Sequence, residues 1–77
     1  MRILNVAVDR VGTSRDGRNL VIGRGRDVMT GWTISFVVPA GDRDRVVREV
    51  RGGGRPMISV PEVDALPWAS VSGVAWE

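Results

Sequence analysis

The chain has 77 residues, of which 11 are basic and 9 acidic, so its formal net charge is only +2. A chain of this length has room for one hydrophobic core, and we expect a single domain over residues 1–77. Histidine, cysteine, lysine and tyrosine are all absent, so the side chains that most often serve as catalysts are missing, and we expect no enzyme activity, cofactor or metal.

Two strands joined by a hairpin are predicted first. Apolar and polar residues alternate over Ile3–Val11, which is the pattern of a half-buried strand. Turn-forming residues fill 12–19 and predict the hairpin loop. The second strand is expected over Leu20–Arg26, where Gly23 and Gly25 indicate a bend or a close approach of other backbone.

The third strand, predicted over 32–38, has the clearest alternation in the chain. Its apolar face consists of Trp32, Ile34, Phe36 and Val38. We expect this face to line the core, with the aromatic rings covering the bare backbone of Gly23 and Gly25. A two-residue turn at Met29–Thr30 is predicted to join the second and third strands.

One short helix is predicted over about Arg43–Arg51, where valines recur at helical spacing. Asp42 precedes it and is expected to cap its free amide groups with its carboxylate. Three glycines at 52–54 are expected to end the helix with a left-handed residue.

The remainder of the chain is predicted to add two strands. The fourth is expected over Met57–Val60, where Pro61 stops it. Residues 62–67 are expected to form a loop, and the fifth strand is expected over Ala69–Trp76.

The predicted order is therefore strand, strand, strand, helix, strand, strand, a mainly β fold class with one short helix. In a chain of this size the order resembles the OB-fold, a five-stranded Greek-key barrel with its helix between strands three and four. The resemblance spans the whole chain and rests on element order, not on a residue motif. An SH3-like barrel is the alternative, but it would need the helix to shrink to a single 3₁₀ turn.

A polar face on the second and third strands is the candidate binding site. The predicted turn places Arg26 opposite Thr33 and Arg24 opposite Ser35, so that two arginines and two hydroxyls share one face. The resemblance to the OB-fold implies that this outer face binds single-stranded nucleic acid. The predicted site consists of Arg24, Arg26, Thr33 and Ser35, together with Arg15 and Arg18 of the first loop.

A protein-interaction module is the competing hypothesis, either docking on a protein partner or pairing with a second copy through an exposed strand edge. The low net charge favours it, as does the lack of an aromatic stacking platform on the polar face. Every basic residue is an arginine, which is typical of GC-rich genomes such as those of actinomycetes and their phages. A small phage accessory protein that docks on a host protein is therefore an example of this hypothesis. We expect no membrane contact and a cytoplasmic location.

Overall fold

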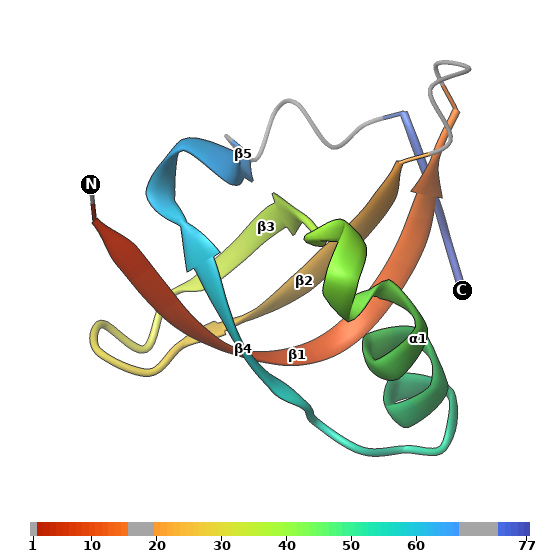
Figure 1. Cartoon of the computed structure of the whole chain (residues 1–77), viewed down its shortest axis with the longest axis horizontal. Helices are drawn as coiled ribbons and strands as arrows, with labels where there is room; N and C mark the ends of the chain where they lie inside the picture. The colour runs from red at the N-terminus through yellow and green to blue at the C-terminus, as the bar shows by residue number, and fades with distance from the viewer. Residues whose placement is uncertain (1, 16–19, 67–72) are drawn as a thin grey trace.

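The computed structural model describes residues 2–15, 20–66 and 73–77 (Figure 1). The strands in these residues are β1 (Ile3–Ser14), β2 (Val21–Asp27), β3 (Thr33–Val37), β4 (Met57–Pro61), β5 (Ala65–Leu66) and β6 (Val74–Trp76). The α-helix α1 (Arg43–Arg51) follows the 3₁₀ turn η1 (Ala40–Asp42), and a second 3₁₀ turn, η2 (Glu62–Asp64), follows β4. None of the described helices is long and apolar enough to cross a membrane.

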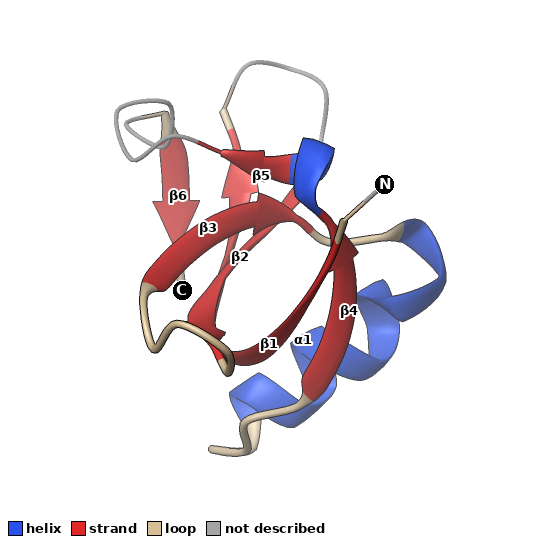
Figure 2. Cartoon of the chain, turned by 90° about the vertical axis from the view of Figure 1, so that its left-hand side faces the viewer, coloured by secondary structure: helices blue, strands red, loops and turns tan. Residues whose placement is uncertain are grey.

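The strands form one antiparallel sheet in the order β4-β1-β2-β3-β5, and β6 also pairs with β1 (Figure 2). The long, curved β1 pairs with β4 through Ile3–Ala7 and with β6 through Gly12–Ser14. Among the described residues no pairing joins β4 to β5, so these residues form an open sheet, not a closed barrel. The mainly β class with one short helix is confirmed, and a nine-residue helix is longer than the SH3-like alternative allows.

Among the described residues, Phe36 is the largest fully buried side chain, and it belongs to the core cluster. Its ring lies against Gly23, as predicted: a Cβ added at Gly23 would stand 2.7 Å from the Cε2 atom of Phe36. The other members of the buried cluster are Val6, Val8, Val11, Val38, Val46, Ile58 and Val60. Val46 is the residue through which α1 enters this cluster, whereas Ile34 is only partly buried.

The turn between β2 and β3 is longer than predicted, yet the predicted register is confirmed. The amide of Asp27 donates to the carbonyl of Trp32 at 2.9 Å, which leaves a four-residue loop, 28–31, in place of two residues. Gly31 has a φ of 76°, a left-handed conformation that suits glycine. Both turns are centred between residues 29 and 30, so the pairing of the flanking strands is unchanged.

The helix begins differently from the prediction and ends as predicted. The carboxylate of Asp42 makes no capping hydrogen bond, because η1 continues into α1 and the amides of Asp42 and Arg43 donate to the carbonyls of Pro39 and Ala40. At the other end Gly53 is left-handed, with a φ of 87°. The amides of Gly53 and Gly54 donate to the last-turn carbonyls of Val50 and Glu49, which is the pattern of a Schellman motif.

The end of the chain departs most from the predicted elements. Of the strand expected over Ala69–Trp76, residues 73–76 are described, and β6 occupies 74–76 of them. Residues 67–72 lie outside the described residues. A further strand, β5, occupies two residues of the expected loop and pairs with β3. Two residues are too few to show a strand periodicity in the sequence.

Candidate functional site

Arg26 and Thr33 are the predicted site residues that the structure leaves both together and exposed. They are cross-strand partners, and Arg26 also pairs with Ala7 of β1, which in turn pairs with Met57 of β4. A row of side chains, Met57–Ala7–Arg26–Thr33, therefore crosses four strands on the outer face of the sheet. Arg26 has no ion-pair partner among the described residues, so its guanidinium is available to a ligand.

Arg24 lies on the same face as Arg26 but is already engaged. A β-bulge between Val8 and Arg10 places the extra residue, Asp9, beside Arg24. The Nε atom of Arg24 lies 3.5 Å from Oδ1 of Asp9, and the arginine side chain is only 29% exposed. Its charge is therefore largely compensated within the protein, and the prediction of a freely available guanidinium is not met at this position.

Ser35 was expected on the exposed polar face and is instead buried, with 1% of its surface accessible. It pairs with Arg24 as predicted, and Ile22, two residues before Arg24 on β2, is also buried. The alternation of a strand assigns each side chain to a face, but it does not reveal whether that face is covered. The Ser35 end of this face is covered, so this hydroxyl cannot contact a ligand.

Of the two predicted loop arginines, the structure describes Arg15, which does not join this site. Arg15 is exposed, but it lies eight residues beyond Ala7 along the direction of β1, a path of about 26 Å at about 3.3 Å per residue. Its amide donates to the carbonyl of Gly73 near β6. Arg18 falls outside the described residues.

Trp32 gives the largest departure from the prediction, because it lies outside the core and is 73% exposed. It precedes Thr33, the first residue of β3, and therefore lies outside the strand. Its cross-strand neighbour is the charged residue Asp27, not an apolar core residue. Met29 and Val28 of the same loop are also exposed, at 83% and 52%. We call Val28, Met29 and Trp32, together with the adjoining Arg26, Thr33 and Met57, the loop surface.

Hydrogen bonds brace the backbone of the β2–β3 loop. The buried carboxylate of Asp27 accepts from the amide of Met29 at 2.9 Å, and the hydroxyl of Thr30 accepts from the amide of Trp32 at 3.2 Å. The amide of Val28 donates to the carbonyl of Asn5 on β1, at 3.0 Å. An aspartate whose carboxylate accepts from the amide two residues later is a known signal of a turn. Asp27 in the sequence could therefore have indicated that the loop begins at 28.

The charges around the loop surface are sparse. Two arginines near this face are paired, Arg24 with Asp9 and Arg2 with Glu62, at 3.5 and 3.8 Å. Arg10, the cross-strand partner of Arg24, lies over the ring of Trp76 at 5.5 Å. Asp27, the acidic residue of the loop, is buried with 4% exposure. The loop surface thus combines apolar side chains with one positive charge, and its own six residues include no carboxylate.

Comparison of the chain with protein-family models, with curated proteins and with solved structures finds no match in any of the three.

Proposed function

We propose that this protein is a non-enzymatic, cytoplasmic binding module that docks on a protein partner through the loop surface. The observation that carries the proposal is the joint exposure of Trp32, Met29 and Val28 on a loop that hydrogen bonds hold in place. Large apolar side chains gathered at one place on a small protein are typical of interaction sites, whereas isolated ones are not.

The composition of the loop surface resembles the centre of a protein interface. Such centres are rich in tryptophan, methionine and arginine and poor in acidic residues and lysine. A preordered loop also reduces the entropy that binding would otherwise cost. The partner is therefore a protein with an apolar pocket for Trp32 and a carboxylate facing Arg26. A second copy fits less well, because the loop surface carries no carboxylate to meet Arg26.

Single-stranded nucleic acid is the second candidate, and one specific observation favours it. Trp32 is exposed and precedes Thr33, the partner of Arg26, so an aromatic ring on which a base could stack stands next in sequence to this pair. The order of three strands, a helix and a further strand is also compatible with an OB-like fold, and the ligands of OB-folds bind this face. The loop surface has one free arginine, however, so the predicted slope of log K against log salt is only about −0.7.

The test compares variants of the exposed positions with a matched control. Trp32→Ala and Arg26→Glu should abolish capture of a specific partner from an extract of the source cells, and Val63→Ser should retain it. Val63 is 78% exposed on η2, away from the β2–β3 loop in both views (Figures 1 and 2). Capture that survives Trp32→Ala would refute the proposed surface.

A direct assay separates the two candidates. Labelled oligo(dT) and oligo(rU) are titrated with the protein at low salt, where electrostatic association is strongest. The protein-docking proposal expects no saturable binding. Saturable binding that is lost with Trp32→Ala would show instead that the loop surface binds single-stranded nucleic acid. Analytical ultracentrifugation adds a check on self-association, and a dimer broken by Trp32→Ala would overturn the choice of a different protein as partner.

A further inference from the structure

The edge of β4 that faces away from β1 has no partner among the described residues. The amide of Glu62 donates to the carbonyl of Arg2 at 2.9 Å, in the same register in which β4 pairs with β1. In an antiparallel ladder the residues that exchange such bonds recur at every second position, so the even-numbered residues of β4 make the hydrogen bonds to β1. The amides of Met57 and Ser59, and the carbonyls of Met57, Ser59 and Pro61, therefore point toward the unpaired side. We call this unpaired side of 57–61 the β4 edge.

The β4 edge is uncharged and exposed. None of the five residues of β4 is charged, and Met57 and Ser59 are exposed. Edge strands of natural proteins usually carry charges that prevent pairing with another chain. Here the nearest charges in sequence lie beyond the two ends and are opposite in sign: Arg55 precedes β4, and Glu62 follows it. Arg55 is exposed and has no ion-pair partner among the described residues.

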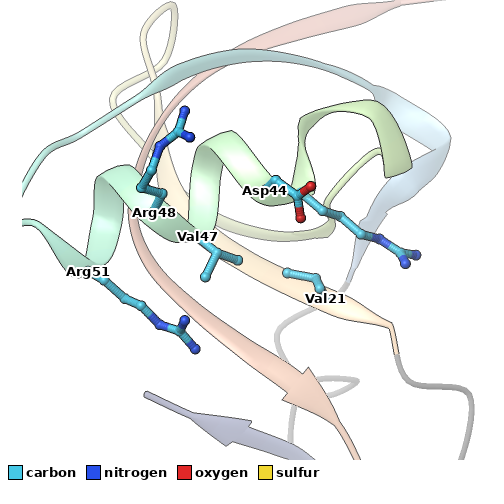
Figure 3. Close-up of a pocket in the computed structure, with 6 residues that line it drawn as sticks. Val21, Asp44, Val47, Arg48 and Arg51 are labelled. Atoms are coloured by element: carbon cyan, nitrogen blue, oxygen red, sulfur yellow. The ribbon is translucent and has the colours of Figure 1, made fainter.

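An open groove of about 650 Å³ beside α1 has a different character. Its lining residues are Val21, Arg43, Asp44, Val47, Arg48 and Arg51 (Figure 3). Charges of both signs surround its two valines, and Arg51 already forms an ion pair with Glu77. The β4 edge, by contrast, offers unpaired backbone groups that no charged residue of β4 interrupts.

We infer that two copies of this chain pair along the β4 edge, with their β4 strands antiparallel and centred on Ser59. Ser59 then lies opposite Ser59 of the second copy, and Met57 lies opposite Pro61. Residues opposite each other in this register are both odd-numbered, so their unpaired backbone groups meet. The amide of Met57 donates to the carbonyl of Pro61 in the other copy, and the two Ser59 residues exchange backbone hydrogen bonds. The sheets of the two copies become one continuous sheet across a two-fold axis.

The residues around the β4 edge complement themselves in this arrangement. Arg55 of one copy reaches the end of the other strand where Glu62 follows, and the two-fold axis repeats the contact. A parallel arrangement would place like charges together instead. Met57 packs beside Pro61 of the second copy, whose neighbour on β1 is Ile3, so two side chains that are exposed in one chain join a single apolar row. Because one strand supplies both halves of each contact, the occupant of the β4 edge is a second copy of this chain.

Sedimentation velocity of the full chain at increasing concentration tests this dimer. Ser59→Lys places two ammonium groups opposite each other at the two-fold axis, and Ser59→Glu places two carboxylates there. Each should raise the dissociation constant at least about tenfold, because like charges directly opposite each other repel. An equimolar mixture of the two variants should restore the dimer, because opposite charges then meet. Variants that had only lost their fold would not rescue each other.

Thr13→Lys is the matched control. It adds the same charge to an exposed residue of β1 that already has a partner on each side, Val21 and Ala75. It should change the dissociation constant less than about twofold, because exposed charges away from the axis are screened. Trp32→Ala should leave the dimer intact as well, which separates this test from that of the proposed function. Only Met57 belongs both to the β4 edge and to the loop surface.

Ser59→Cys tests the register, because the parent chain has no cysteine. Opposed hydrogen-bonded residues of antiparallel strands have Cα atoms about 5.5 Å apart, a separation that a disulfide can span. Oxidised glutathione should therefore convert Ser59→Cys into a covalent dimer at least about tenfold faster than Thr13→Cys. A chain that remains monomeric at millimolar concentration would overturn the inference. So would a dimer that Ser59→Lys leaves intact, a dimer that Trp32→Ala breaks, or equal rates of cross-linking.

Discussion

Substitution of Gly23 by alanine tests the packing of the core. An added Cβ would stand 2.7 Å from Cε2 and 2.8 Å from Cζ of Phe36, and 3.1 Å from Cγ2 of Val38. Comfortable carbon contacts are about 3.5–4.0 Å, so the ring would have to move by roughly 0.8 Å or more. Phe36 and Val38 are both fully buried, and neither can swing out into solvent.

The expected net loss is about 1–2 kcal/mol. Overpacking a filled core typically costs about 1–3 kcal/mol. Alanine restricts the unfolded chain more than glycine does, and this returns roughly 0.4–1 kcal/mol where the native backbone tolerates it. A chain of 77 residues has a total stability of about 4–12 kcal/mol, so the net loss is readily measured.

Urea unfolding followed by far-ultraviolet circular dichroism measures the change, with Gly41→Ala as the matched control. A Cβ added at Gly41 meets nothing within 4 Å, so that variant should be as stable as the parent chain or slightly more stable. Replacing the ring by a smaller side chain, with Phe36→Leu, should relieve the clash. In a double-mutant cycle, at least about 0.5 kcal/mol of the stability lost in Gly23→Ala should then be recovered. If Gly23→Ala is as stable as Gly41→Ala, the ring does not rest on the glycine.

Two further outcomes follow from the helix and its contact with the C-terminal strand. Asp42→Ala should cost less than about 0.5 kcal/mol in urea unfolding, against about 1 kcal/mol for a true capping residue, because its carboxylate caps no amide; a full loss would contradict the observed helix start. Glu77, whose pKa is lowered by its hydrogen bond and charge contact with Arg51, stabilises the fold above the ordinary glutamate pKa of about 4.3 and ceases to do so as the pH falls below its folded-state pKa. The stability difference between the parent chain and Glu77→Gln should therefore shrink as the pH falls from about 5 through the folded-state pKa of Glu77, and a difference that does not change with pH would count against the pair.

Local patterns predicted the strand pairing well. The register of Arg26 with Thr33 follows from the position of the turn centre, and that centre is the same for a two-residue and a four-residue loop. The ring of Phe36 over Gly23 follows from the same register. These features depend on residues that are close together in the chain, which is why the sequence alone was sufficient for them.

Accessibility could not be predicted in the same way, because it depends on segments distant in sequence. Alternation assigned Ser35 to the exposed face and Trp32 to the core face. Ser35 is instead buried, and Trp32 is instead exposed. The engagement of Arg24 requires the bulge that places Asp9 beside it, and no periodicity reveals a bulge. The candidate site therefore kept the Arg26–Thr33 pair and moved from the face of β2 and β3 to the loop that joins them.

The edge of β1 that pairs with both β4 and β6 also determines when the chain can fold during synthesis. β1 pairs first with β4 and further along with β6. Val6 can pair only after Ile58 has been synthesised, 52 positions later, and Gly12 only after Trp76, 64 positions later. A ribosome-bound chain would thus expose part of the β1 edge until its last strand had emerged. Contacts between such distant positions make folding slow, on the order of milliseconds to seconds. In that interval the nascent edge is the segment most open to pairing with a neighbouring chain.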